Sequence, residues 1–387
     1  MEVLKKNLAT IYSFAFFINL FFAMVLLGIP LYAIELEAGN IELGWLGSLG
    51  AFTYTISVPF SGWLADRFSK RWLSCGGAVI FGLAVLIAPF LHKLVFLYFV
   101  VFGYSLGQAF IWPAMESRLS QIVPKEKLSF IVGWYNLSWC LGFIFGPYLA
   151  GWIFERKTEL VFWIAGLGGI VFSVLSLYSP AKPAVQGKRQ TDSEDKVYFL
   201  YLAWMANIML YFVQGVLRNI FPKLATELGI SSGRLGLLFL LMSLAQGLFF
   251  VILNLYPRWH FRLNWLLGAQ VLGILGLVMI VFSKGFSGFA PGFFLVGSAS
   301  GISYFSSLYY AISLSEKLAG SRSGWHEFFI GAGALTGPIL GGVFAEYVGA
   351  KSPYAFSIAF MIMMIFAQLI YYRHAQSSQE TSASTPH

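Results

Sequence analysis

Ionisable side chains are scarce inside the long apolar runs of this sequence, and those few are where chemistry is expected. Arg218 lies towards the end of one run, beside Gln214 and Asn219, and His326 and Glu327 lie together near the start of another. A charged group in a bilayer costs about 2.5–3.5 kcal/mol on insertion scales and usually marks function. We expect Arg218 either to bind an anionic group or to reach the membrane interface. We expect Glu327, with His326, either to carry a proton or to cap its helix.

Other polar side chains within the apolar runs are weaker candidates for lining a central cavity, because each could equally make a hydrogen bond between helices. They are Asn19, Gln108, Trp112, Asn136, Asn207, Gln214 and Tyr304.

Two patterns resemble catalytic motifs but lack the required residues or context. His326-Glu327 begins an HExxH zinc motif, yet position 330 is Ile. Gly103-Tyr-Ser105-Leu-Gly107 matches GxSxG, but it lies within an apolar helix and follows no strand. No glycine-rich ATP site is apparent, so we expect no enzyme activity, no cofactor and no metal.

The composition indicates a protein that faces lipid. The chain has 387 residues, of which 58% are hydrophobic and only 11% charged, with a mean hydropathy of +0.73. A soluble domain has about 25% charged residues. The net charge of +8 resides in short loops, so it indicates membrane topology and not nucleic-acid binding. Cys75 and Cys140 lie inside apolar runs and predict neither a disulfide nor a metal site.

Breaks at charged and Gly-, Pro- or Asn-rich positions predict twelve membrane-spanning helices, each of about 20 apolar residues. Their ranges are roughly 8–35, 44–65, 72–91, 94–115, 128–154, 160–179, 198–222, 234–256, 263–283, 286–314, 324–347 and 353–372. Most loop Lys and Arg residues fall on the side that holds both termini, which predicts cytoplasmic termini. The short loops favour the inner membrane of a prokaryote.

Two halves resemble each other at a shift of 191–192 residues. The repeated anchors are Gly133-Trp134 with Gly324-Trp325, Gly146-Pro147 with Gly337-Pro338, and Pro30 and Gly44 with Pro222 and Gly236. We therefore predict an all-α membrane protein of two pseudo-symmetric six-helix bundles, at residues 1–179 and 198–373. A polar cytoplasmic linker at 180–197 joins them, and a disordered tail follows at 374–387.

The loop after the second predicted span carries a recognisable motif. It reads Gly62-Trp63-Leu64-Ala65-Asp66-Arg67-Phe68-Ser69-Lys70-Arg71. This resembles the signature G-x-L-a-D-r-x-G-r-k of the major facilitator superfamily, with Ser69 in place of the usual glycine. The resemblance implies a two-bundle transporter in which this loop helps to hold the cytoplasmic side shut.

In that family role, Gly62 permits close helix approach and Asp66 lies near the start of the eleventh span, at Ser323. Arg67 or Arg71 could pair with Glu116. Lys70 and Arg71 could instead be simple positive-inside anchors. The corresponding loop in the second half, residues 257–262, has no acidic residue.

A second motif resembles the GxxxGP element that the family's antiporter-type exporters carry. It comprises Gly142, Gly146 and Pro147 in the fifth span and Gly333, Gly337 and Pro338 in the eleventh. Small residues let helices pack closely and proline bends them, so ordinary packing explains the pattern as well. The exporters' arginine in the fourth span is missing.

From these observations we predict a secondary transporter that works by alternating access, with proton-coupled efflux of a small amphipathic or drug-like compound. The alternatives are uptake or exchange of an organic anion, suggested by Arg218, and a membrane sensor that transports nothing. The expected partners are a small-molecule substrate, protons and membrane lipid. The family resemblance implies a monomer.

Overall fold

The computed structural model describes residues 2–122, 125–177, 196–313 and 319–384, and nearly all of these residues are helical. The twelve long helices in this part of the chain are α1 (Glu2–Glu35), α2 (Asn40–Arg67), α3 (Lys70–Ile87), α4 (Leu94–Ile122), α5 (Lys125–Phe154), α6 (Thr158–Ser173), α7 (Tyr198–Asn219), α9 (Ser232–Leu255), α10 (Leu263–Phe282), α11 (Phe286–Ser313), α12 (Ala319–Tyr347) and α13 (Ser352–Ser384). The short elements are α8 (Phe221–Glu227) and the 3-10 helices η1 (Ala88–Phe90), η2 (Val174–Leu177) and η4 (Pro257–Trp259).

Each predicted span corresponds to one of these helices, within a few residues at most ends. The tail prediction differs from the structure, because α13 continues to Ser384 where we expected disorder after residue 373. No Gly or Pro interrupts the chain between Tyr354 and Thr385, and Ala, Gln and Glu in this stretch favour a helix. Most of the predicted linker, residues 180–195, lies outside the described residues.

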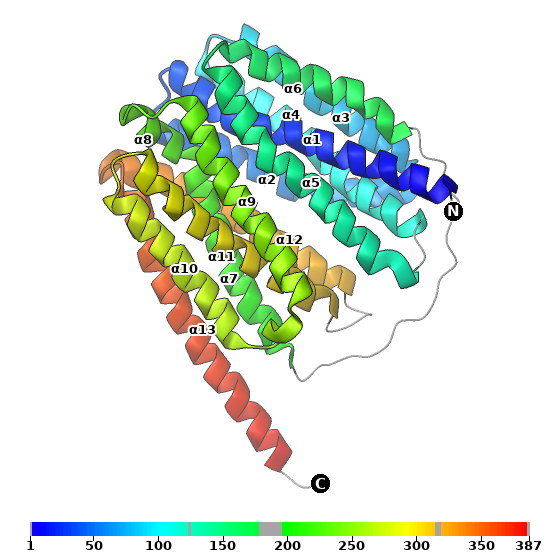
Figure 1. Ribbon diagram of the computed structural model, residues 1–387, viewed down its shortest axis with the longest axis vertical. Helices are drawn as coiled ribbons and strands as arrows, with labels where there is room; N and C mark the ends of the chain where they lie inside the picture. Colours follow the sequence, from blue (N-terminus) through cyan, green and yellow to red (C-terminus); the bar gives the residue numbers. More distant parts are fainter. Residues whose placement is uncertain (1, 123–124, 178–195, 314–318, 385–387) are drawn as a thin grey trace.

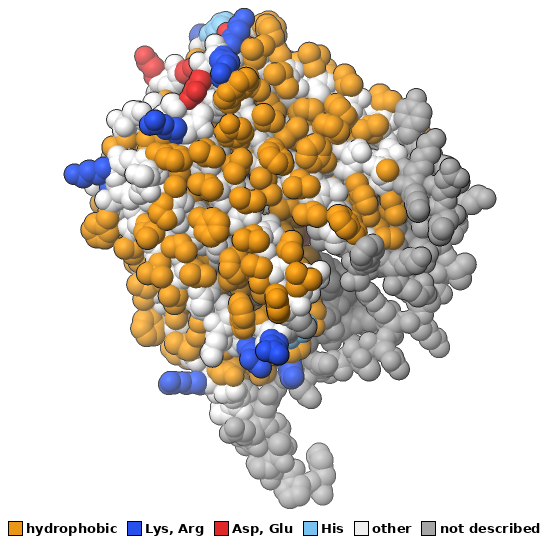
Figure 2. Space-filling view, in the orientation of Figure 1, with side chains coloured by type: hydrophobic (Ala, Val, Ile, Leu, Met, Phe, Trp, Pro, Cys, Tyr) orange, Lys and Arg blue, Asp and Glu red, His pale blue; other side chains and the backbone are white. Residues whose placement is uncertain are grey.

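Ten of the long helices are long and apolar enough to cross a membrane. The two others are α2, which is rich in Gly, Ser and Thr, and α11, which is rich in Gly and Ser. The molecular surface is apolar around its middle, and Lys and Arg side chains gather towards the two ends of the helices (Figure 2).

The helices form two bundles, α1–α6 and α7–α13, whose internal packing repeats (Figure 1). In the first bundle α1 packs on α5 and α6, α3 packs on α4 and α6, and α2 packs on α4. In the second bundle α7 packs on α12 and α13, α10 packs on α11 and α13, and α9 packs on α11. The bundles meet mainly along two helix pairs, α2 with α12 and α5 with α9, which correspond to each other under the repeat.

We call the end at which α1 ends and α2 begins the distal end, and the end that carries both termini the terminal end. Near the distal end the bundles touch backbone to backbone. A Cβ on Gly44 would lie 2.5 Å from the Pro338 carbonyl oxygen, and one on Gly236 would overlap the Pro147 carbonyl oxygen. The Ser48 hydroxyl donates to the Leu335 carbonyl across the same interface, at 2.6 Å.

The same helix faces are apart at the terminal end. Gly62, Gly133 and Gly324 each lie five turns along their helix from a glycine that touches the other bundle. Apart from its chain neighbours and the nearby backbone of its own helix, no described atom comes within 4 Å of a Cβ built on any of the three. Trp134 and Trp325 beside them are each 51% exposed. The structure is therefore closed at the distal end and open at the terminal end. Gly62, expected to allow close helix approach, has no other described helix within 4 Å of a Cβ built on it.

Candidate functional site

Four polar residues lie on one face of α7. Asn207, Tyr211, Gln214 and Arg218 follow one another at spacings of four, three and four residues, which a helix places in one stripe. Asn207 is fully buried, and neither its amide nitrogen nor its amide oxygen has a hydrogen-bond partner among the described residues. The Gln214 amide nitrogen also lacks one. Buried polar groups are usually paired, so the amide nitrogens of this face can donate hydrogen bonds to a bound molecule or water, and Asn207 Oδ1 can accept one.

Arg218 lies between the two bundles and not at the lipid surface. Its guanidinium Cζ lies 5.1 Å from the ring centre of Phe143, on α5, and 6.0 Å from that of Phe239, on α9. Its Nη2 donates to Gln214 Oε1 at 3.3 Å. No carboxylate of the described residues lies within 4.0 Å of its nitrogens. A guanidinium on aromatic rings without a carboxylate partner can bind a planar anionic group.

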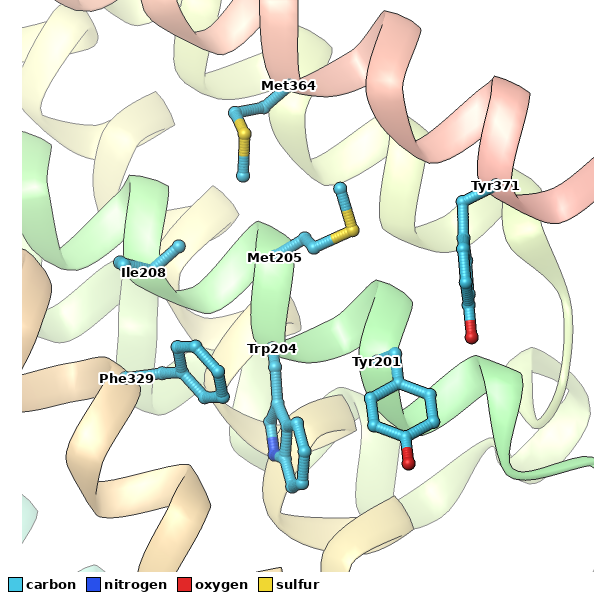
Figure 3. A pocket seen from close by; sticks show the side chains of 7 residues that line it. All are labelled: Tyr201, Trp204, Met205, Ile208, Phe329, Met364 and Tyr371. Carbon is cyan, nitrogen blue, oxygen red and sulfur yellow. The ribbon is translucent and has the colours of Figure 1, made fainter.

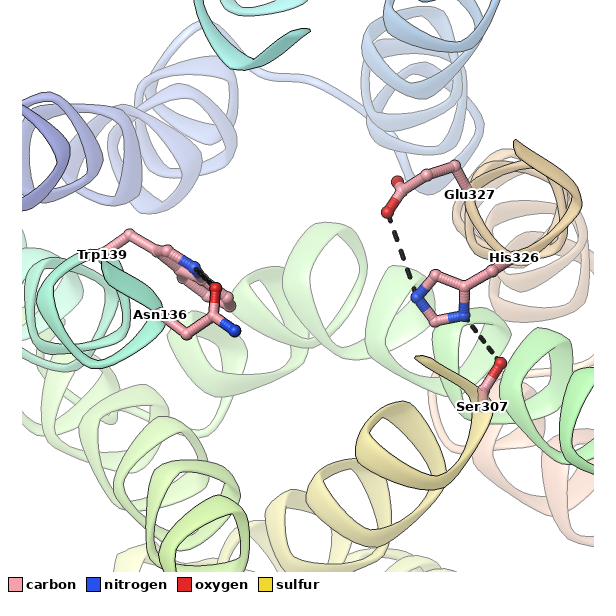
Figure 4. A network of polar contacts seen from close by, with 5 residues as sticks. All are labelled: Asn136, Trp139, Ser307, His326 and Glu327. Atoms are coloured by element: carbon pink, nitrogen blue, oxygen red, sulfur yellow. Dashed lines mark hydrogen bonds and ion pairs between the residues drawn. The ribbon is translucent and has the colours of Figure 1, made fainter. Parts of the chain in front are cut away.

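Glu327, His326 and Ser307 form a contact network between α12 and α11 (Figure 4). His326 is fully buried, and its Nδ1 lies 2.7 Å from Ser307 Oγ. Its Nε2 lies 4.0 Å from Glu327 Oε1, which is close enough for attraction but too long for a hydrogen bond. The Glu327 side chain is 47% exposed. This carboxylate can therefore meet water while its neighbour stays inside the protein.

Tyr304 connects this network to the polar face of α7. Its ring meets the His326 ring edge-on at 5.1 Å between centres and lies 6.3 Å from the ring of Tyr211. The electrostatic environment of the Tyr211 hydroxyl includes both Glu327 and Arg218. The two ionisable groups that the sequence indicated therefore share one region of the second bundle.

The first bundle contributes aromatic side chains with amide partners. On α4, Trp112 Nε1 donates to Gln108 Oε1 at 2.7 Å, and on α5, Trp139 Nε1 donates to Asn136 Oδ1 at 3.1 Å. Figure 4 shows Asn136 and Trp139 on the opposite side of the bundle interface from His326 and Glu327. The Trp139 ring meets the Phe250 ring of α9 at 6.5 Å. Asn19 is buried where α5 packs on α1.

Several residues of this region were missed by the sequence reasoning. They are Trp139, Phe143, Tyr211, Phe239, Phe250 and Ser307. Tyr211 could have been found, since it completes the helical spacing of Asn207, Gln214 and Arg218. The aromatic residues gave no signal, because aromatic residues make up 18% of the chain.

Only part of the predicted gating loop can be described. The side chains of Asp66, Glu116 and Ser323 lie outside the described residues, so their pairing stays a prediction. The Arg67 guanidinium lies 4.0 Å above the ring of Trp63, one turn back on its own helix. The backbone oxygens of Lys70 and Arg71 accept from the Ser74 hydroxyl, at 2.9 and 3.2 Å.

The GxxxGP elements lie at helix contacts within each bundle. Gly142 and Gly146 face the backbone of α1, and Gly333 and Gly337 face the backbone of α7. At each of these positions a Cβ would overlap a carbonyl oxygen or come within 2.6 Å of one. The prolines that follow, Pro147 and Pro338, present their carbonyl oxygens to the other bundle.

An apolar pocket of about 510 Å³ lies elsewhere, between α7, α12 and α13 (Figure 3). Its lining comprises Tyr201, Trp204, Met205, Ile208, Phe329, Met364 and Tyr371. Trp204 precedes Arg218 by 14 residues on α7, which is about 21 Å along the helix. The pocket therefore lies far from Arg218, although Ile208 and Phe329 in its lining are close in sequence to Asn207 and Glu327.

The sequence matches the model of a known protein family. The model of the Major Facilitator Superfamily matches residues 9–202 and 203–386. The quinolone resistance protein NorA of Staphylococcus aureus is 21% identical over 392 residues, which cover 97% of this chain and 99% of that protein. An uncharacterized MFS-type transporter of Methanocaldococcus jannaschii, MJ1560, is 26% identical over 177 residues, or 46% of each chain.

Solved structures share the fold. A bacterial homolog of the human lysosomal transporter Spinster, in an inward-facing and unoccupied conformation, has a TM-score of 0.74 at 13% identity and covers 97% of both chains. The nucleoside transporter NupG also has a TM-score of 0.74, at 14% identity, over 95% of this chain and 99% of that one.

Proposed function

This chain belongs to the major facilitator superfamily, and we propose that it exports a small amphipathic, drug-like compound in exchange for protons. The observation that carries the proposal is the ionisable pair of α12, Glu327 with His326, beside buried polar and aromatic groups of α7 and α11. The likeness to a protein named for quinolone resistance supports export of a drug-like compound.

The difference between the two ends of the molecule fits a transport cycle of alternating access. The polar region lies between bundles that are closed at the distal end and apart at the terminal end. Rocking of the repeats about such a region exposes it to each side in turn. We place the terminal end in the cytoplasm, because most loop Lys and Arg residues lie there. The conformation described is then inward-facing.

Glu327 is the proton carrier in this scheme. Its half-exposed carboxylate exchanges a proton with water on the open side, and the buried imidazole of His326 lies 4.0 Å from it. Ser307 fixes the orientation of that imidazole through Nδ1, so His326 Nε2 stays directed at Glu327. Proton binding removes a charge from the bundle interface, which makes closure of the terminal end less costly.

The test is proton-linked flux in inverted membrane vesicles, with norfloxacin and ethidium as probes. We expect the wild-type protein to release protons when either probe is added to acidified vesicles, and Glu327→Gln to abolish the signal. Glu227→Gln is the matched control, because Glu227 is an exposed carboxylate at the end of α8. Proton-linked flux that survives in Glu327→Gln would remove Glu327 as carrier.

Arg218 favours a second candidate function, uptake or exchange of an organic anion. Its guanidinium is packed on Phe143 and Phe239, and no described carboxylate neutralises it. Thermal-shift titrations with 2-naphthoate and tetraphenylphosphonium separate the candidates. Stabilisation of the wild type by naphthoate, absent in Arg218→Ala, favours the anion. Equal stabilisation of both proteins by the phosphonium cation favours the exporter.

A further inference from the structure

Two carboxylates join the bundles at the distal end. Glu155 follows the last residue of α5, and its Oε1 accepts a hydrogen bond of 2.7 Å from the backbone N–H of Gly233, in the first turn of α9. Glu346 lies in the last turn of α12, and its Oε2 accepts from Asn40 Nδ2 at 3.0 Å and from the Asn40 backbone N–H at 3.4 Å, at the start of α2. Each carboxylate therefore binds the N-terminus of a helix in the other bundle.

The two contacts are related by the internal repeat. Residues 146–155 read GPYLAGWIFE and residues 337–346 read GPILGGVFAE, so the proline, the glycine four residues after it and the glutamate recur in register. Their four-residue spacing places all three on one face of each helix. This face makes the same three contacts twice: a proline carbonyl against a glycine, a glycine against the first residue of the facing helix, and a carboxylate on its N-terminus.

Helix N-termini attract carboxylates for two reasons. The first backbone N–H groups of a helix have no partner within the helix, and its dipole leaves a partial positive charge there. On α2 the N-cap residue is Gly39, which has no side chain to cap the helix, so Glu346 of the other bundle supplies the cap. On α9 the Ser231 side chain makes one long capping contact, of 3.4 Å with the Arg234 N–H, and Glu155 binds the N–H of Gly233.

Hydrogen bonds with Ser231 and Gly233, with smaller attraction from Arg156 and Arg234, hold the pKa of Glu155 below its usual value. The ionised form of the Glu155 carboxyl is therefore more stable when the distal end is closed than it is in water. Glu42 is a second negative charge near the contact between Glu346 and Asn40, because the carboxylates of Glu42 and Glu346 both approach Gly39.

We propose that Glu155 and Glu346 are paired positioning residues of the transport cycle, which hold the distal end shut by capping α9 and α2 across the interface. Opening of the distal end breaks both caps, and closing remakes both. The inference requires no particular substrate and no particular coupling ion, so it is independent of the proposed export function.

The experiment measures the distance between spin labels on the two bundles. Lys93 and Lys284 are exposed, lie in repeat-related distal loops, and make matched labelling sites in a background without Cys75 and Cys140. The variants are Glu155→Ala, Glu346→Ala, the double variant and the control Glu227→Ala. All three carboxylates are exposed, so each alanine removes a surface side chain without opening the core.

We expect each single variant to raise the ratio of distal-open to distal-closed molecules about five-fold, which is typical for loss of one capping interaction. The double variant should raise it about 25-fold if the two caps act independently. Glutamine at either position keeps an acceptor oxygen but loses the charge, so it should give a smaller rise. Distance distributions of the double variant that match those of Glu227→Ala would overturn the inference, whatever the outcome of the flux measurements.

Discussion

A single methyl group at Gly44 should open the distal end. Gly44 lies on the face of α2 that touches α12, where its Cβ would lie 2.5 Å from the backbone oxygen of Pro338. Ordinary contact begins at 3.4 Å, so in Gly44→Ala the two helices must separate by about 0.9 Å. A backbone oxygen in a helix cannot rotate away as a flexible side chain could.

The expected magnitude follows from the cost of overpacking. Extra carbon atoms in a well-packed contact cost about 1–3 kcal/mol. This cost falls only on the distal-closed state, because α2 and α12 separate at this point when the distal end opens. The population ratio should therefore shift towards the distal-open state by about 5- to 150-fold. The helix propensity gained by replacing Gly with Ala, about 1 kcal/mol, is present in both states and cancels.

Hydrogen–deuterium exchange with mass spectrometry measures the result. Peptides that cover residues 36–48 and 338–349 should take up deuterium faster in Gly44→Ala than in the wild type. The control is Gly268→Ala, a mid-helix change on α10 with no atom within 4 Å of the new Cβ. Gly236→Ala, at the repeat-related contact with Pro147, should reproduce the effect. Equal uptake in Gly44→Ala and Gly268→Ala would show that the distal contact does not control opening.

Three further predictions concern the interface and the packing of the second bundle. The pKa of Glu155 is lowered in the closed state, so the stabilisation that its carboxylate gives that state is complete above the ordinary glutamate pKa of about 4.3 and is lost as pH falls through the lowered value. The distance between spin labels at Lys93 and Lys284 should therefore lengthen on acidification below about pH 4. A distance that does not change with pH would contradict this. Asn207→Leu removes two unpaired buried atoms and should raise thermal stability by about 1–3 kcal/mol. Gln270→Leu, which breaks the hydrogen bond to Gln368, should lower stability. Lower stability in both variants would mean that Asn207 has a hydrogen-bond partner. Trp259→Ala should cost about 3–5 kcal/mol in thermal unfolding, because this side chain is buried and donates to the Leu253 carbonyl, while Tyr256→Ala, 67% exposed, should cost under about 0.5 kcal/mol.

The fold was largely predictable because lipid imposes a simple rule on this chain. Each span must bury its backbone polar groups in a helix of fixed length, so charged and glycine-rich breaks locate the helix ends. The rule fails for residues 374–384, which are polar and yet helical. There the absence of Gly and Pro decides the structure, not hydropathy.

The candidate site was predictable only in part. Arg218, Glu327 and His326 are conspicuous because charge is rare in the spans, and the structure brings their regions together. The distal carboxylates Glu155 and Glu346 are equally visible in the repeat, but they resemble ordinary loop charges. What distinguishes them is the helix N-terminus that each one meets in the other bundle, and local sequence carries no information on that contact.

The weak hydropathy of α2 and α11 bears on how the chain enters the membrane during synthesis. A helix inserts alone when the apolar side chains along it outweigh its polar groups, and these two helices carry many Gly and Ser residues, with Thr also in α2. Both pack on helices of higher hydropathy, α2 on α4 and α11 on α10. Small and hydroxyl-bearing residues are the ones through which helices associate in lipid. We therefore expect α2 and α11 to depend on neighbouring helices for stable insertion. The neighbour of α11 is α10, which directly precedes it, and the neighbour of α2 is α4, which is synthesised two helices later.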